Sequence, residues 1–250
     1  QLEQDPNLSR DPIALRRLGD AQAASGRPAA AASRYEQAML IAPPDGIAGL
    51  KLIELWRTAG DSPRALEVAR NLHRALPDHA PITRLLASLA LGSGDYSWAF
   101  SLLEEVTPKL PDSVDLRLDH ALAAAATGRL DPARQSLHAA LRLAPTPTEA
   151  TQIQRQLQAL DFVSDPATAA RSEEKLTALL AAEPKLVTAI FASGLAAEHR
   201  GQHATAQSSY HRTLQLAPDF APARKRLVIL LANADDDNSN ALALALKARR

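Results

Sequence analysis

The stretch GRPAAAASRYEQAMLIAP, residues 26–43, contains three residues whose spacing decides the fold of this chain. Gly26 opens it, Ala31 follows five residues later, and Pro43 closes it. The same three residue types recur at the same separations in four further stretches, which run from Gly60 to Pro77, Gly94 to Pro111, Gly128 to Pro145 and Gly201 to Pro218. The first four prolines are 34 residues apart, and the fifth lies 73 residues further on. A fixed period of this size predicts a tandem array of repeats, with one longer and divergent member.

Each repeat is predicted to be a pair of helices around its glycine. Apolar or small residues recur three, four and seven positions apart on both sides of it, which is the period of a helix and not of a strand. In the first repeat the two stretches are residues 13–23 and 29–41. A glycine just past the first helix favours a left-handed cap, and a proline after the second helix ends the backbone ladder. The recurrent alanine indicates a close helix crossing, because a larger side chain would push the helices apart.

This repeat resembles the tetratricopeptide repeat (TPR), a 34-residue helix–turn–helix with Leu-Gly in the first helix and Ala-x3-Phe, then Pro, in the second. The first repeat matches best, with Leu18-Gly19, Ala31-x3-Tyr35 and Pro43. The leading tryptophan of the family is absent, and Leu103 and Leu137 replace the aromatic residue in the third and fourth repeats. The resemblance implies an all-α, right-handed α-solenoid of about seven repeats and fourteen helices.

The spacing also divides the chain. The expected repeats are residues 12–45, 46–79, 80–113, 114–147, the divergent 148–186, 187–220 and the shortened 221–250, after a tail of a preceding repeat at 1–11. We therefore interpret the chain as a piece of a longer array. In such an array each repeat is expected to pack only on its neighbours.

The fifth repeat lacks the turn glycine and is five residues longer than the others. We expect its first helix to end at Leu160, residues 161–164 to form a longer connection, and Asp165 to precede the second helix. Two interpretations stay open. The extra residues are a tolerated surface-loop insertion, or they form a binding or bending element that exposes Phe162 and Val163.

Composition excludes several classes of function. Lys plus Arg equals Asp plus Glu at 28 each, without a basic run, so a nucleic-acid partner is not expected. Because no apolar run approaches 18 residues, this segment is not expected to insert into a membrane. The absence of cysteine excludes disulfides and Cys-ligated zinc. This absence favours a location in the bacterial periplasm or envelope, with the cytoplasm as the alternative.

Candidate catalytic and metal-binding residues are few. His199 and His203 are four residues apart, but the turn at Gly201 separates them, so they do not share one helix face. Asp235 and Asp237 alternate as at the start of a calcium loop, which here lacks its glycine and its distal glutamate. His120, on an apolar face, is predicted to be a packed core residue. The sequence thus predicts no enzyme, no cofactor and no metal.

The resemblance implies that first helices line a concave groove, at positions thirteen, ten, six and three before each turn glycine. The candidate partner-binding residues are Arg16, Asp20, Ile47, Leu50, Glu54, Arg84, Leu118, Leu122, Phe191, Leu195 and Ile229. The alternative is that some of them, above all Leu118 and Leu122, pack on adjacent first helices. No three-repeat window contains the cations and amides of the clamp with which some TPR domains hold two carboxylates. A ligand of this groove is therefore expected to bind through apolar contacts that depend weakly on salt.

These observations favour a non-catalytic scaffold for protein–protein interaction, whose groove receives a peptide or helix of an unidentified partner. The Ala-, Leu- and Arg-rich composition and the long array are similar in style to proteins of bacterial envelope and exopolysaccharide secretion or assembly systems. The alternatives are a structural spacer or self-associating array without a groove ligand, and a regulatory arm of a catalytic domain outside this segment.

Overall fold

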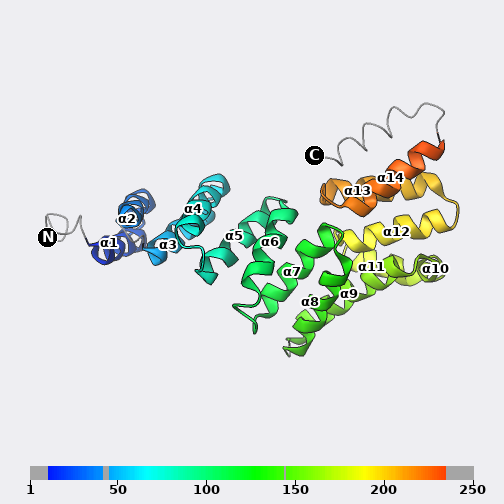
Figure 1. Cartoon of the computed structure of the whole chain (residues 1–250), viewed down its shortest axis with the longest axis horizontal. Coiled ribbons are helices and arrows are strands. Elements are labelled where there is room, and N and C mark those ends of the chain that lie inside the picture. Colours follow the sequence, from blue (N-terminus) through cyan, green and yellow to red (C-terminus); the bar gives the residue numbers. More distant parts are fainter. Residues whose placement is uncertain (1–10, 42–44, 144, 235–250) are drawn as a thin grey trace. The chain divides into compact units, whose positions relative to one another are not determined.

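The computed structural model describes residues 11–41, 45–143 and 145–234, in which all regular elements are helices (Figure 1). The all-α prediction is therefore confirmed. The chain forms two compact bodies, Gln1–Ser93 (the N-terminal body) and Gly94–Arg250 (the C-terminal body), and their boundary falls within the third repeat. The predicted tail at 1–11 (apart from Asp11), the loop at 235–240 and the final helix at 241–250 lie outside the described residues.

Five helices build the N-terminal body. They are α1 (Pro12–Ala24), α2 (Pro28–Leu40), α3 (Gly46–Thr58), α4 (Ser62–Ala75) and α5 (Ala80–Gly92), each packed on the next. Aspartates at the N-caps of α1, α3 and α4 accept hydrogen bonds from first-turn N–H groups, as at Asp45, whose carboxylate accepts from the backbone of Ile47 and Ala48.

Nine helices are described in the C-terminal body. They are α6 (Tyr96–Val106), α7 (Val114–Ala126), α8 (Leu130–Arg142), α9 (Pro147–Ser164), α10 (Pro166–Arg171), α11 (Glu173–Ala182), α12 (Val187–His199), α13 (His203–Leu216) and α14 (Ala221–Ala234). The described residues thus contain fourteen helices, the number expected from the sequence, but they are not the same fourteen. The second helix of the fifth repeat is divided into α10 and α11, whereas the expected last helix is not among the described residues.

Two of the three repeated residues, the glycine and the alanine, have the roles that their spacing predicted. All five turn glycines have a positive φ, between 72° at Gly26 and 80° at Gly94, a conformation that a side chain disfavours. The five alanines that follow them are all 0% exposed, namely Ala31, Ala65, Ala99, Ala133 and Ala206. The close helix crossing inferred from the sequence thus recurs in the regular pairs that lie within one body, namely α1–α2, α3–α4, α7–α8 and α12–α13.

The fifth repeat differs from both interpretations of its extra residues. Residues 161–164 do not form a loop, because α9 continues through them to Ser164, where Asp165 caps the next helix through the Thr168 N–H. Phe162 and Val163 are 4% and 9% exposed and belong to the main apolar core of the C-terminal body. The expected exposure of these two residues was therefore wrong. Their side chains continue the apolar face of α9, so burying them favours extending the helix.

The C-terminal body also brings together repeats that are not neighbours in sequence. The corner between α13 and α14 packs against the turn that follows α7. A Cβ atom placed on Gly128 would lie 2.4 Å from Cδ of Pro222, and Ala126 shares a core cluster with Phe220 and Leu227. The expectation that each repeat packs only on its neighbours is wrong here, because the fourth repeat contacts the seventh.

Two buried positions in each helix pair vary together in size. These are the residue seven positions before the turn glycine and the residue nine positions after it. In the first and sixth repeats they are a glycine and a tyrosine, and a Cβ on Gly19 or Gly194 would lie 2.6 or 2.4 Å from Cε1 of Tyr35 or Tyr210. In the fourth repeat they are alanine and leucine, namely Ala121 with Leu137, both buried. A larger residue at one place therefore accompanies a smaller one at the other.

His120 is a buried residue of α7, 8% exposed, as the sequence predicted. Its Nδ1 atom lies 2.7 Å from Oγ of Ser136, with which it shares a hydrogen bond, and its ring packs on Phe100 with 5.0 Å between centroids. Burial lowers the pKa of His120; Glu104 opposes this shift, and Arg117 adds to it. The folded chain therefore holds this imidazole neutral at pH values where the unfolded chain protonates it.

The stability of the C-terminal body is consequently expected to depend on pH through His120. Because the folded pKa lies below the unfolded value near 6.5, its contribution is complete above that pH and decreases as the pH falls through it. The third repeat has Leu86 and Leu102 at the equivalent positions, so His120→Leu/Ser136→Leu is the matched variant. Urea unfolding at pH 5.5 and 7.5 should show a smaller loss on acidification in the variant. Equal losses in both proteins would contradict the role assigned to His120.

Candidate partner-binding site

Exposed apolar side chains concentrate at the predicted groove positions. Among the described residues, five large hydrophobic side chains are exposed, namely Ile13 (49%), Leu40 (85%), Ile47 (51%), Leu122 (42%) and Ile229 (37%). Ile13 and Ile47 lie thirteen positions before their turn glycine, and Leu122 lies six before Gly128. Ile229 lies six before residue 235, the place that a turn glycine would take in the seventh repeat. Only Leu40, on a second helix, is outside this pattern.

The charged groove residues of the N-terminal body form ion pairs within the chain. Arg16 Nε lies 3.6 Å from a carboxylate oxygen of Asp45, and Arg57 Nε lies 2.9 Å from Glu54. The remaining candidates in this body, Leu50 and Arg84, are half-buried, and Arg84 also has an interaction partner. Since these groove charges are largely compensated within the chain, the apolar groove residues are the ones left to contact a ligand.

Asp20 is bound to two helices at once. Its carboxylate accepts a hydrogen bond of 2.8 Å from the Tyr35 hydroxyl on α2, and Lys51 Nζ on α3 lies 2.7 Å away. Burial by itself would raise the pKa of Asp20, but the hydrogen bonds from Lys51 and Tyr35 outweigh it, so the net pKa is lowered. Asp20 therefore ties the first repeat to the second and is not a free acceptor for a ligand.

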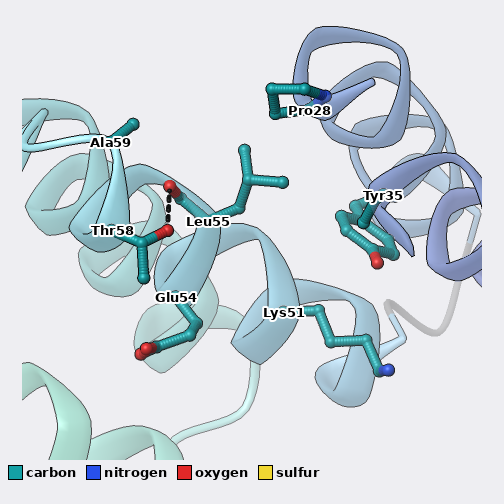
Figure 2. Close-up of a pocket in the computed structure, with 8 residues that line it drawn as sticks. Pro28, Tyr35, Lys51, Glu54, Leu55, Thr58 and Ala59 are labelled. Atoms are coloured by element: carbon teal, nitrogen blue, oxygen red, sulfur yellow. Dashed lines mark hydrogen bonds between the residues drawn. The ribbon is translucent and has the colours of Figure 1, made fainter. Parts of the chain in front are cut away.

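A cavity of about 470 Å³ lies between α2 and α3 in the N-terminal body (Figure 2). Figure 2 shows Leu55 directed into the space towards Pro28, with Lys51 and Glu54 further along α3. The lining thus combines an apolar side chain with both signs of charge, and Lys51 is paired with Asp20. This cavity provides room for a side chain but no unpaired cation with which to select one.

The groove candidates of the C-terminal body lie in different environments. Leu122 and Ile229 are exposed, whereas Leu118 and Leu195 are half-buried. Phe191 is 3% exposed, and its ring packs on Tyr210 and Phe220 with centroid distances of 5.5 and 4.9 Å. The structure corrects the expectation for Phe191: its aromatic contacts place it in the core, where a partner does not reach it.

A second cavity, of about 730 Å³, was not foreseen from the sequence. Its lining residues are Thr127, Gly128, Ala221, Pro222, Arg224, Lys225, Val228 and Ile229. Repeat spacing did place Pro222, Lys225 and Ile229 on the groove face of α14. The spacing gave no indication that the turn of the fourth repeat, at Thr127 and Gly128, would form the other wall of this cavity. Repeat spacing describes neighbouring repeats, whereas these two repeats are far apart in sequence.

No group of three or more His, Asp or Glu side chains in the described part of the chain could hold a metal ion. His199 ends α12 and His203 begins α13, so the two belong to different helices. Asp235 and Asp237 lie outside the described residues. Within residues 11–41, 45–143 and 145–234, no helix is both long and apolar enough to span a membrane.

Comparison with known proteins gives one family match. The tetratricopeptide repeat model matches residues 90–157. No curated protein sequence matches the chain significantly.

Several solved structures resemble the chain. A MamA fragment beginning at residue 41, from Desulfovibrio magneticus RS-1, is 15% identical with a TM-score of 0.47, over 82% of this chain and 94% of that one. A MamA structure from AMB-1 is 19% identical with a TM-score of 0.46, over 84% and 99%. YrrB, a TPR protein with an unusual peptide-binding site, is 12% identical with a TM-score of 0.48, over 86% and 91%. All three scores lie below 0.5.

The assignment follows from the repeat itself. Residues 90–157 match the repeat model. Every regular helix pair has its turn glycine at positive φ and its crossing alanine fully buried, at the positions that the repeat requires. This chain therefore contains tetratricopeptide repeats.

Proposed function

We propose that this chain is a non-catalytic scaffold that binds a peptide or helical segment of a partner protein on the first-helix face of its repeats. A TPR array is a scaffold for protein–protein interaction. The observation that supports the location is that four of the five exposed large hydrophobic side chains occupy groove positions, namely Ile13, Ile47, Leu122 and Ile229. Covering a side chain that is about half exposed contributes roughly 1 kcal/mol, so each such contact strengthens binding about fivefold.

Charge supports the same mode of recognition. Arg16 and Glu54 are paired with Asp45 and Arg57, so neither is available to a ligand without breaking an ion pair. Binding on this face should therefore depend weakly on ionic strength, because burial of apolar area is not screened by salt. A loss of affinity of more than about tenfold over a physiological salt range would contradict apolar recognition.

The test uses a displayed library of random dodecapeptides selected on the full chain. Peptides that bind the wild type should bind Ile13→Ser/Ile47→Ser about tenfold or more weakly, since each serine removes about 1 kcal/mol of apolar contact. Leu40→Ser is the matched control, because Leu40 is more exposed than either isoleucine but lies on a second helix. Equal loss in the control, or no loss in the double variant, would contradict the proposed face.

We place the scaffold in a bacterial envelope or exopolysaccharide secretion or assembly system, a proposal that its composition and array style support. A spacer or self-associating array would give no selected peptides, and light scattering of the purified chain would then show whether copies associate. Such a result would replace the scaffold proposal by one of these alternatives.

A further inference from the structure

The cavity at the start of α14 exists because the fourth and seventh repeats meet. Thr127 and Gly128 form one wall, and the first turns of α14 form the other, 94 residues later in the sequence. The contact is tight at Gly128, where any Cβ would lie 2.4 Å from Pro222 Cδ and 2.5 Å from its Cγ. A proline ring cannot move aside as a flexible side chain does, so this contact sets the distance between the walls.

The charges around this cavity are all of one sign. Arg224 and Lys225 line it, and no carboxylate does. Arg224 donates to the carbonyl of Pro218, and neither cation is paired with a carboxylate among the described residues. The cavity between α2 and α3 instead contains both Lys51 and Glu54, and a cavity beside α9 contains Arg155 paired with Glu183 at 3.0 Å.

The rest of the lining is apolar. Pro222, Val228 and the exposed Ile229 present hydrocarbon to the space, whose volume of about 730 Å³ accommodates two or three side chains. The cavity also lies at the beginning of a fourteen-residue helix, where the partial positive charge of the helix dipole adds to that of the two cations.

We propose that this cavity binds a short apolar segment of a partner protein that carries one carboxylate, with the apolar side chains against Val228 and Ile229 and the carboxylate beside Lys225. The proposal rests on the scaffold function proposed above and adds the chemistry of one ligand. It differs from a two-carboxylate clamp because a single charge meets a largely apolar wall.

The charge of the C-terminal tail argues against the tail as the occupant. Residues 241–246 are apolar, but Lys247, Arg249 and Arg250 follow them. Placing this segment in the cavity would bring these cations towards Arg224 and Lys225. Like charges at this distance repel. A partner segment with a carboxylate complements the cavity, whereas the tail does not.

The first test uses three probes, acetyl-Leu-Leu-Glu-amide, its Gln analogue and its Lys analogue, titrated into the full chain and followed by NMR. The Glu probe should bind roughly two- to fivefold more tightly than the Gln probe, the range expected for one partly exposed ion pair. Lys225→Glu should reverse the preference in favour of the Lys probe. Lys175→Glu, an exposed substitution on α11, is the control and should leave the order unchanged. Equal binding of all three probes, or no reversal in Lys225→Glu, would overturn the proposal.

The second test asks whether the cavity depends on the contact between repeats. Gly128→Ala introduces both a positive-φ strain and a clash with Pro222. Gly94→Ala introduces the same strain at φ 80° without a neighbour within 4 Å. Binding of the Glu probe should weaken in Gly128→Ala and not in Gly94→Ala. Equal binding in both variants would overturn the composite site.

Two further readouts separate the remaining outcomes. Library peptides that depend on Ile13 and Ile47 should bind Gly128→Ala as they bind the wild type, so a failure here is distinct from a failure of the scaffold proposal. Removing residues 241–250 should leave probe binding unchanged. Tighter binding after this truncation would identify the tail as the occupant and overturn the assignment to a partner.

Discussion

Replacing Gly194 by alanine is expected to lower the free energy of unfolding of the C-terminal body by about 2–3 kcal/mol. The new methyl group would lie 2.4 Å from Cε1 and 2.7 Å from Cδ1 of Tyr210, whose ring is fully buried. The ring has no free space to enter, because it also packs on Phe191. Urea unfolding followed by circular dichroism, with hydrogen exchange to separate the two bodies, measures the loss.

Two further variants identify the cause. Gly92→Ala changes a helical glycine with no neighbour within 4 Å, and should be neutral or stabilise by up to about 1 kcal/mol. Gly194→Ala/Tyr210→Leu recreates the pair that the fourth repeat uses, so its cost should be smaller than the sum of the two single costs by about 1 kcal/mol or more. Additive costs would show that the two positions do not constrain each other's size.

The sequence alone predicted the parts of the fold that depend on local chemistry. Turn glycines at positive φ and crossing alanines recur because each satisfies a local steric requirement, which a fixed spacing reveals. The pairing of Gly194 with Tyr210 had a signal in the sequence. In the first, fourth and sixth repeats a small residue seven positions before the turn glycine is accompanied by a larger one nine positions after it. The second repeat reverses the order, with Ile53 and Ala69.

The features that sequence reasoning missed depend on packing between distant segments. Phe162 and Val163 were expected in a loop because the fifth repeat has five extra residues and no turn glycine. In the structure both side chains are buried in the core, and α9 extends through them. The contact between Gly128 and Pro222 has no signature in either repeat, since it follows from how the irregular fifth repeat places the sixth and seventh. The burial of Phe191 by Phe220 arises within the sixth repeat, where the residue that precedes α14 packs back on α12.

The candidate groove was predicted with mixed success for the same reason. Ile47, Leu122 and Ile229 are exposed at the predicted positions, because a position on a helix face is a local property. Whether a charged groove residue is free to bind a ligand depends instead on a neighbouring helix, as for Asp20, which is held by Tyr35 and Lys51. The cavity on α14 needed two repeats that are far apart in sequence, so only the structure could identify it.

Replacing Glu198 is expected to cause the second large loss of stability, because its carboxylate joins three helices of the C-terminal body, α12, α13 and α14. It accepts a hydrogen bond of 2.7 Å from the Tyr210 hydroxyl on α13. It also accepts two from the Arg226 guanidinium on α14, of which the one donated by Nε is 3.0 Å long. Burial and the Glu198 carboxylate raise the pKa of Tyr210, so its hydroxyl stays protonated and donates. The Glu198 side chain is only 15% exposed, so its bonds are poorly replaced by water.

Glu198→Ala is therefore expected to destabilise the C-terminal body by about 2–3 kcal/mol, since it leaves a buried phenol and a half-buried guanidinium without their acceptor. Asp20→Ala removes the corresponding link of the N-terminal body, but Asp20 is 39% exposed, so its cost should be smaller, about 1 kcal/mol. Glu173→Ala is the surface control, because Glu173 pairs with Arg200 at 3.1 Å while 69% exposed, and it should change stability by less than about 0.5 kcal/mol. Urea unfolding of the three variants tests the order. If Glu198→Ala cost no more than Glu173→Ala, the bonds to Tyr210 and Arg226 would not stabilise the junction of the sixth and seventh repeats, and apolar packing around Phe220 and Leu227 alone would hold α14 in place.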